Sequence, residues 1–433
     1  MMLRNDMDKV RNIVAFIVML SVAVFSLSAD AAERMETRTM TFDPNFRSLQ
    51  VKLEGNDYFP PIITRGNDDH ITISFDELKD DVTYLRYSLV HCNADWQPSD
   101  LVESEYVDGF NYAEIDNYEY SSGTFSQFIH YSFTLPNEDM QMLVSGNYLV
   151  KVYRENEPEK TLLQARFSVC ENEVSVAATV TSRTDIDYNR EHQQVSFVVD
   201  TKNYHVRDMY SALKAYVTQN SRIDNEVMVS HPMMATSTTA TFSHIRSLIF
   251  PAGNEFRRIE TVATNYHTMG VEQMEYHHPF YHATLRTDYP RSGEAYLFDR
   301  TQFGRYTIRN AEADNSATSA DYIVTHFVLN TGGPVTGGKI YLDGEFTNHL
   351  FTPSSLMKYD SASGCYVADM FLKQGAYNYQ YLFLPDGSDK AITAHIEGDK
   401  YQTINEYLVR IYNRKPGERY DRFIGYGIAF SGK

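Results

Sequence analysis

The chain has 433 residues and a formal net charge of -18 at pH 7, and it contains 32 Tyr, 25 Phe and one Trp. This acidity argues against nucleic-acid binding and against adsorption to an anionic lipid surface, because both depend on clusters of basic side chains. At about 150 residues per domain, the length predicts about three domains. The hydrophobic content of 42% excludes a disordered chain, and the abundance of aromatic residues favours strands over helices.

The first 31 residues have the pattern of a secretory signal peptide. Arg4, Lys9 and Arg11 precede an apolar run at residues 13–25, and an A-D-A sequence ends at Ala31. The run is shorter than the roughly 20 residues that span a bilayer. We therefore predict cleavage near Ala31 and export to the periplasm, with no membrane span in the mature protein.

Residues 41–170 show the alternation of half-buried strands. Apolar residues occupy every second position at 129–135 and again at 165–169, and turn-forming residues separate such runs at 66–69 and 145–147. This pattern predicts an N-terminal antiparallel β-sandwich.

Similar runs continue to the end of the chain. They predict a middle β-sandwich domain at 171–310 and a C-terminal one at 321–413, joined by a small, polar linker at 311–320. Residues 414–433, rich in Gly, Tyr and Arg, are predicted to form an extended C-terminal tail. The expected fold is all-β, with tandem immunoglobulin-like or fibronectin-like β-sandwich domains.

The stretch 91–110 contains the only Trp and one of three Cys. His91 and Cys92 could be interpreted as a nucleophile and its base, but adjacent residues of a strand point to opposite faces. The alternative is that a strand ends here and residues 93–95 form a turn. Trp96, Tyr106 and Phe110 would then either fill the flank of the first sandwich or form part of a docking face.

Other candidate chemistry is weak. Three imidazoles lie within residues 276–282, with His267 nearby, but Pro279 interrupts the strand and no HExxH or Cys pair accompanies them. We predict no metal, no cofactor and no catalytic site. Cys92 and Cys170 are either joined or free, because their geometry cannot be judged from sequence.

The last domain resembles the early-set immunoglobulin-like modules related to glycogen-binding domains. The similarity rests on DGEFTN at 343–348 and GAYNYQY at 375–381, with His349 where those modules carry an exposed aromatic residue. It implies an alternative function, carbohydrate binding in the periplasm, although the departure at His349 argues against a sugar platform.

A second resemblance covers nearly the whole mature chain. HCNADW at 91–96, followed by EY at 105–106 and GF at 109–110, is its most specific part, and FPPII at 59–63 and GNEFR at 253–257 add to it. With these segments the sequence resembles the type IX secretion system plug protein family.

The resemblance implies a non-enzymatic periplasmic protein associated with the outer membrane. Its partner would be the giant outer-membrane β-barrel translocon of the type IX secretion system, whose pore it would seal from the periplasmic side. The aromatic residues of the predicted tail, Tyr420, Phe423 and Tyr426, form a second candidate contact beside the stretch 91–110.

Overall fold

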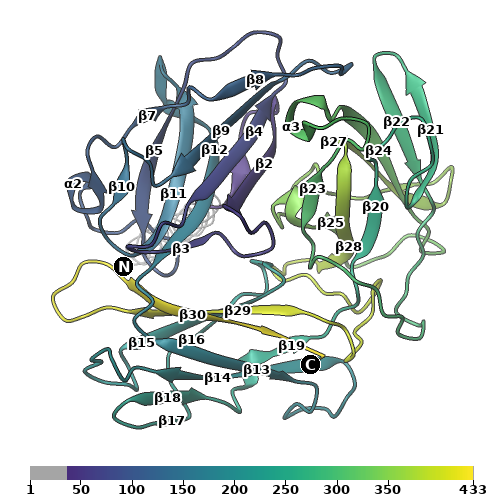
Figure 1. The fold of residues 1–433 in the computed structure, drawn as a ribbon. Coiled ribbons are helices and arrows are strands. Elements are labelled where there is room, and N and C mark those ends of the chain that lie inside the picture. Colours follow the sequence, from purple (N-terminus) through teal and green to yellow (C-terminus); the bar gives the residue numbers. More distant parts are fainter. Residues whose placement is uncertain (1–36, 433) are drawn as a thin grey trace, which may run out of the picture.

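The computed structural model describes residues 37–432, so the predicted signal peptide lies outside the described residues. The described chain is almost entirely β-structure, arranged as three sandwiches that meet around a common centre (Figure 1). The prediction of an all-β protein with tandem β-sandwiches is confirmed. Within residues 37–432, no helix has the length and apolar character needed to cross a bilayer.

The first sandwich consists of two main sheets. One has the order β1-β12-β11-β5-β7, with β3 beside β12, and the other has the order β2-β4-β9-β8. The elements are β1 (Met40–Thr41), β2 (Phe46–Leu53), β3 (Ile62–Thr64), β4 (Ile71–Glu77), β5 (Leu85–Cys92), α2 (Glu103–Tyr106), β6 (Val107–Asp108), β7 (Ala113–Glu114), β8 (Tyr118–Tyr120), β9 (Ile129–Leu135), β10 (Gln141–Met142), β11 (Gly146–Arg154) and β12 (Glu157–Cys170). In β9, buried residues alternate strictly with half-buried ones, as the sequence pattern predicts.

The middle sandwich combines strands from two distant parts of the chain. One sheet has the order β13-β14-β18-β17, with β19 on β14, and the other has the order β16-β15-β29-β30. The elements are β13 (Ser175–Thr181), β14 (His192–Asp200), β15 (Leu213–Gln219), β16 (Val227–Val229), β17 (Met234–Ala235), β18 (Thr239–Phe242), η1 (Arg246–Leu248), β19 (Ile249–Pro251), β29 (Glu406–Asn413) and β30 (Arg422–Phe430). Strands β29 and β30 therefore complete this sandwich, and in Figure 1 they cross it in yellow.

The third sandwich lies in sequence between β19 and β29. One sheet has the order β21-β22-β24-β27-β26, and the other has β20, β23 and β25 paired with β28. The elements are β20 (Arg257–Glu260), β21 (Val271–His277), β22 (Phe280–Leu285), β23 (Tyr306–Ile308), α3 (Ser316–Ser319), β24 (Tyr322–Leu329), β25 (Gly338–Asp343), η2 (Glu345–Thr347), β26 (Lys358–Asp360), β27 (Cys365–Lys373) and β28 (Gly375–Pro385).

Three expectations about chain organisation are wrong. Residues 257–308, expected in the middle sandwich, pair within the third one, and residues 406–413, expected in the third, pair with β15 of the middle one. Residues 311–320 do not form a free linker, since they carry α3 and contact the first sandwich. The predicted tail at 414–433 contains the buried strand β30.

Glycines explain why the predicted tail can be a packed strand. A Cβ atom at Gly425 would lie 2.5 Å from the carbonyl oxygen of Val174, and one at Gly427 would lie 2.6 Å from that of Val176. Because glycine has no side chain, β30 can lie directly against the start of β13, where the two sheets of the middle sandwich approach each other. The glycine content that suggested a loose tail serves close packing instead.

The three sandwiches are joined through buried side chains. Between the first and middle sandwiches lies an apolar cluster that includes Ile62, Cys170, Tyr412 and Phe423. The first and third sandwiches share a buried ion pair, in which the Lys373 ammonium lies 2.5 Å from the Asp76 carboxylate. Such contacts fix the relative positions of the sandwiches in the described part of the chain.

Candidate interaction surfaces

The stretch that begins at His91 is a strand end followed by a tight turn. Strand β5 ends at Cys92, and the Trp96 amide then donates a hydrogen bond to the Asn93 carbonyl at 2.9 Å. Trp96 itself adopts a positive φ of 65°, which closes the turn. The interpretation of residues 93–95 as a turn is confirmed.

His91 and Cys92 are not poised for nucleophilic catalysis. The His91 Nε2 group donates to the Ser145 carbonyl at 3.0 Å, and Nδ1 lies 2.7 Å from the Ser99 hydroxyl, so both ring nitrogens are engaged within the fold. Burial lowers the pKa of His91 to about 4 and raises that of the Cys92 thiol to about 12. At neutral pH the pair is therefore a neutral imidazole and a neutral thiol.

The turn joins the first sandwich to the end of the chain. The Ala94 amide donates to the Asp421 carboxylate at 3.2 Å, and the Asn93 side-chain oxygen accepts hydrogen bonds from Arg414 at 2.8 Å and from the Asp421 amide at 3.2 Å. Because Arg414 and Asp421 lie between β29 and β30, the HCNADW sequence holds the hairpin that completes the middle sandwich.

Four of the six side chains predicted to mediate interactions are buried in this structure. Trp96 is covered by the Arg166 guanidinium, 4.2 Å from the ring centroid, and the Tyr106 hydroxyl donates to the Leu89 carbonyl at 3.1 Å. Tyr420 packs edge-on against the His91 ring, and Phe423 belongs to the interface between the first and middle sandwiches. These four side chains contribute to packing within the protein.

The other two candidates are accessible, and their role in binding stays a prediction. Phe110 is 74% exposed, on the loop between β6 and β7 of the first sandwich. Tyr426, on β30, is half-buried and lines a cleft of about 1060 Å³ where the three sandwiches meet. Sequence alone did not separate these two from the buried four, because all six are aromatic residues in turn-rich segments.

Aromatic side chains from all three sandwiches line that cleft. They are Tyr58 and Phe59 of the first sandwich, Phe298 and Phe303 of the third, and Tyr426 and Phe430 of β30. Two ion pairs lie in the walls, with Arg305 2.7 Å from Glu406 and Arg258 2.9 Å from Asp299. The cleft thus offers mainly apolar walls, and it was not predicted because its parts are far apart in sequence.

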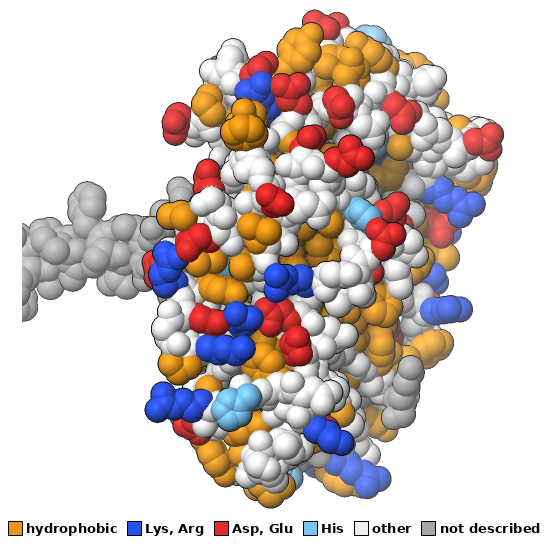
Figure 2. Space-filling model, turned by 60° about the vertical axis from the view of Figure 1, so that its left-hand side comes forward, with side chains coloured by type: hydrophobic (Ala, Val, Ile, Leu, Met, Phe, Trp, Pro, Cys, Tyr) orange, Lys and Arg blue, Asp and Glu red, His pale blue; other side chains and the backbone are white. Residues whose placement is uncertain are grey.

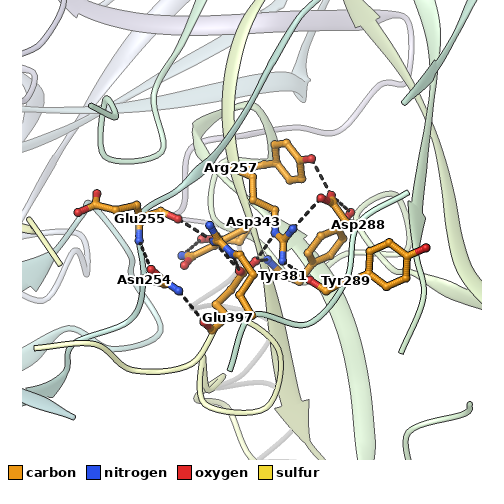
Figure 3. A network of polar contacts seen from close by, with 11 residues as sticks. Asn254, Glu255, Arg257, Asp288, Tyr289, Asp343, Tyr381 and Glu397 are labelled. Atoms are coloured by element: carbon orange, nitrogen blue, oxygen red, sulfur yellow. Dashed lines mark hydrogen bonds and ion pairs between the residues drawn. The ribbon is translucent and has the colours of Figure 1, made fainter. Parts of the chain in front are cut away.

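A buried polar network marks the entry of the chain into the third sandwich (Figure 3). Arg257 contacts Glu397 at 3.0 Å and Asp288 at 2.6 Å, while Arg291 approaches Glu397 at 2.6 Å. Burial alone would raise the pKa of Glu397, but the two guanidinium groups hold it below its ordinary value. The Glu397 carboxylate therefore remains ionised and paired, which suits a structural role and not that of a general acid.

The histidine-rich segment forms the hairpin of β21 and β22. His278 and Pro279 make the turn between β21 and β22, and His282 contacts His326 at 2.9 Å and packs edge-on against the His277 ring. Among residues 37–432, no three His, Cys, Asp or Glu side chains are arranged to hold an ion.

Two further residues from the sequence analysis are structural. All three cysteines are free and buried, so Cys92 and Cys170 are not joined in this structure. His349 is also buried, with its Nδ1 atom 2.9 Å from the Asp343 carboxylate. The position at which related modules carry an exposed aromatic residue therefore presents no sugar platform.

The fold defines a protein built of several β-sandwiches. A model of the type 9 secretion system plug protein 1st domain matches residues 46–171. A crystal structure of a hypothetical protein from Parabacteroides merdae is 41% identical, with a TM-score of 0.90, and the match covers 91% of this chain and 99% of that one. Comparison with curated proteins gives no match. Residues 46–171 therefore carry the first domain of a type 9 secretion system plug protein.

Proposed function

We propose that the protein is a periplasmic subunit that binds the outer-membrane translocon of the type 9 secretion system and seals its pore from the periplasmic side. The match of residues 46–171 to the first domain of type 9 secretion system plug proteins is the observation that carries this proposal. In this proposal the protein has a binding role without catalysis.

The rigidity of the three-sandwich body supports a sealing role. A plug must keep its shape against a wide opening, and a string of independently moving domains would leave gaps. Here the first sandwich contacts the middle one through the turn at Asn93 and the third one through Lys373. The β29–β30 hairpin also ties the end of the chain back into the centre of the protein.

Recovery of the translocon from solubilised outer membranes tests the proposal. A tagged copy of the full chain is expressed in cells that carry the type 9 system, and the captured proteins are identified by mass spectrometry. We expect a very large outer-membrane protein in the eluate. A second measurement is the ionic conductance of the purified translocon in a bilayer, which the added protein should lower from the periplasmic side. Absence of the translocon from the eluate would refute the proposal.

A further inference from the structure

Exposed aromatic side chains gather on the outer edge of the first sandwich. Phe110 is 74% exposed, Tyr112 47% and Tyr84 79%, and all three flank the short edge strand β7 and the adjoining strand β5. The Phe110 and Tyr112 rings pack together with a centroid distance of 5.7 Å. We call Phe110 and Tyr112 the Phe110 surface. Large exposed apolar groups placed side by side mark interaction sites more often than scattered ones do.

The backbone of the Phe110 surface is held in place by Asn111. The Asn111 side chain accepts a hydrogen bond from the Leu89 amide at 2.9 Å and donates one to the Leu89 carbonyl at 2.8 Å, as a neighbouring strand would do. The residues on either side of Asn111 are therefore fixed to the edge of β5. A partner that binds Phe110 need not immobilise a mobile loop, so less affinity is lost to ordering.

Arg86 orders the second ring of the surface. Its guanidinium lies 5.4 Å from the Tyr112 ring centroid and contacts Glu114 at 2.8 Å and Glu155 at 2.7 Å. Tyr112 is thus supported from below by a cation whose own position is set by two carboxylates. Rigid aromatic groups of this kind are the usual binding hot spots of protein interfaces.

Carboxylates surround the aromatic groups. Glu114 and Glu155 are exposed, and Glu103, also exposed, accepts a hydrogen bond from Asn111 at 3.0 Å. Arg86, which lies among them, is already engaged by two of these carboxylates. Figure 2 shows this side of the molecule, with hydrophobic and acidic side chains interspersed over its upper part. The complement of such a surface is an apolar pocket edged by Lys or Arg.

We propose that the Phe110 surface is the contact by which the first sandwich binds the translocon, with Phe110 inserted into an apolar pocket that has a basic rim on the partner. This inference rests on the proposed function and specifies its interface. The acidic rim steers the approach and the aromatic anchors supply the affinity, so binding weakens as the salt concentration rises.

The test compares capture of the translocon by the full-length wild type, by Phe110→Ala and by Tyr188→Ala. Tyr188 is a matched control, because it is 62% exposed and lies over a guanidinium, that of Arg183 at 5.2 Å, but belongs to the middle sandwich. Loss of a hot-spot side chain corresponds to about 30-fold weaker binding. We expect that loss for Phe110→Ala and none for Tyr188→Ala, with unchanged Trp96 fluorescence in both.

Crosslinking in cells provides an independent readout. A photoreactive phenylalanine analogue at position 110 should form an adduct with the translocon, whereas the same analogue at position 188 should not. If the wild type captures the translocon but Phe110→Ala does so equally and no adduct forms at 110, the inference is wrong and the proposed function stands. If the wild type itself captures no translocon, the proposed function fails and the inference fails with it.

Discussion

Replacing Lys373 by methionine tests whether a buried ion pair holds the first and third sandwiches together. Lys373 is 2% exposed, and its Nζ atom lies 2.5 Å from the Asp76 carboxylate and donates to the Ala317 carbonyl at 2.6 Å. Asp76 also accepts hydrogen bonds from Tyr322 at 2.7 Å and His130 at 2.6 Å. The substitution preserves side-chain length while removing the charge.

The expected loss of stability is large because the Asp76 carboxylate stays behind. Removing one partner of a buried ion pair typically costs about 3–5 kcal/mol, since the remaining charge is left without compensation in a poorly solvated site. An exposed pair is worth about 0–1 kcal/mol. Lys52→Met is the matched control, because Lys52 contacts Asp57 at 3.1 Å and the Asp57 side chain is 53% exposed.

The pH dependence of this loss has a defined sign. Burial alone would raise the pKa of Asp76, but Lys373 and His130 hold it below its ordinary value. A carboxyl group with a depressed pKa in the folded state contributes stability above its ordinary pKa and loses that contribution as the pH falls through the folded value. The difference between wild type and Lys373→Met should therefore narrow as the pH falls, beginning where Asp76 of the variant, buried and without Lys373 beside it, takes up its proton.

Urea denaturation followed by Trp96 fluorescence provides the assay, because Trp96 is the only tryptophan and lies in the first sandwich. A shift in the midpoint for Lys373→Met no larger than that for Lys52→Met would refute the reasoning. The double variant Asp76→Asn/Lys373→Met should recover part of the loss, since it leaves no buried charge without a partner.

Three further outcomes are expected. Gly425→Val should destabilise the middle sandwich by about 2 kcal/mol or more, measured by thermal unfolding, because its Cβ atom would meet the Val174 carbonyl at 2.5 Å. Burial lowers the pKa of His91 to about 4, so as the pH falls the unfolded chain takes up this proton before the folded protein does. The free energy of unfolding should therefore fall by about 3 kcal/mol from pH 6.5 to pH 4. In urea titrations of His91→Gln at several pH values, this decrease in the free energy of unfolding should be absent. A maleimide reagent should leave the buried free cysteines unlabelled in the native protein and label them in urea.

Local patterns in the sequence predicted individual strands well. The alternation at 129–135 corresponds to β9, with its buried and half-buried faces in the predicted phase. Alternation succeeds here because it reports which face of a strand is apolar, a property of neighbouring residues alone. The turn after Cys92 was predicted for the same reason, since its polar residues and its main-chain hydrogen bonds are local.

The assignment of strands to sandwiches could not be obtained from such patterns. Strand β29 has an apolar character that suits either the third or the middle sandwich, and only its pairing with β15 decides between them. That pairing depends on residues far apart in the chain. The exposure of a single aromatic residue also depends on residues far away in the chain. Trp96, for example, lies in the turn after β5 and is covered by Arg166 of β12.

The insertion of the third sandwich into the middle one has a consequence for the order of folding. Leu213 is paired with Asn413, and β30 follows only after that point, so the middle sandwich lacks two strands of one sheet until residues 406–430 have been synthesised. The first and third sandwiches contain all of their own strands earlier and can form before then. The middle sandwich is therefore the last to close, and a chain truncated before Glu406 would expose its unpaired β15 edge to aggregation.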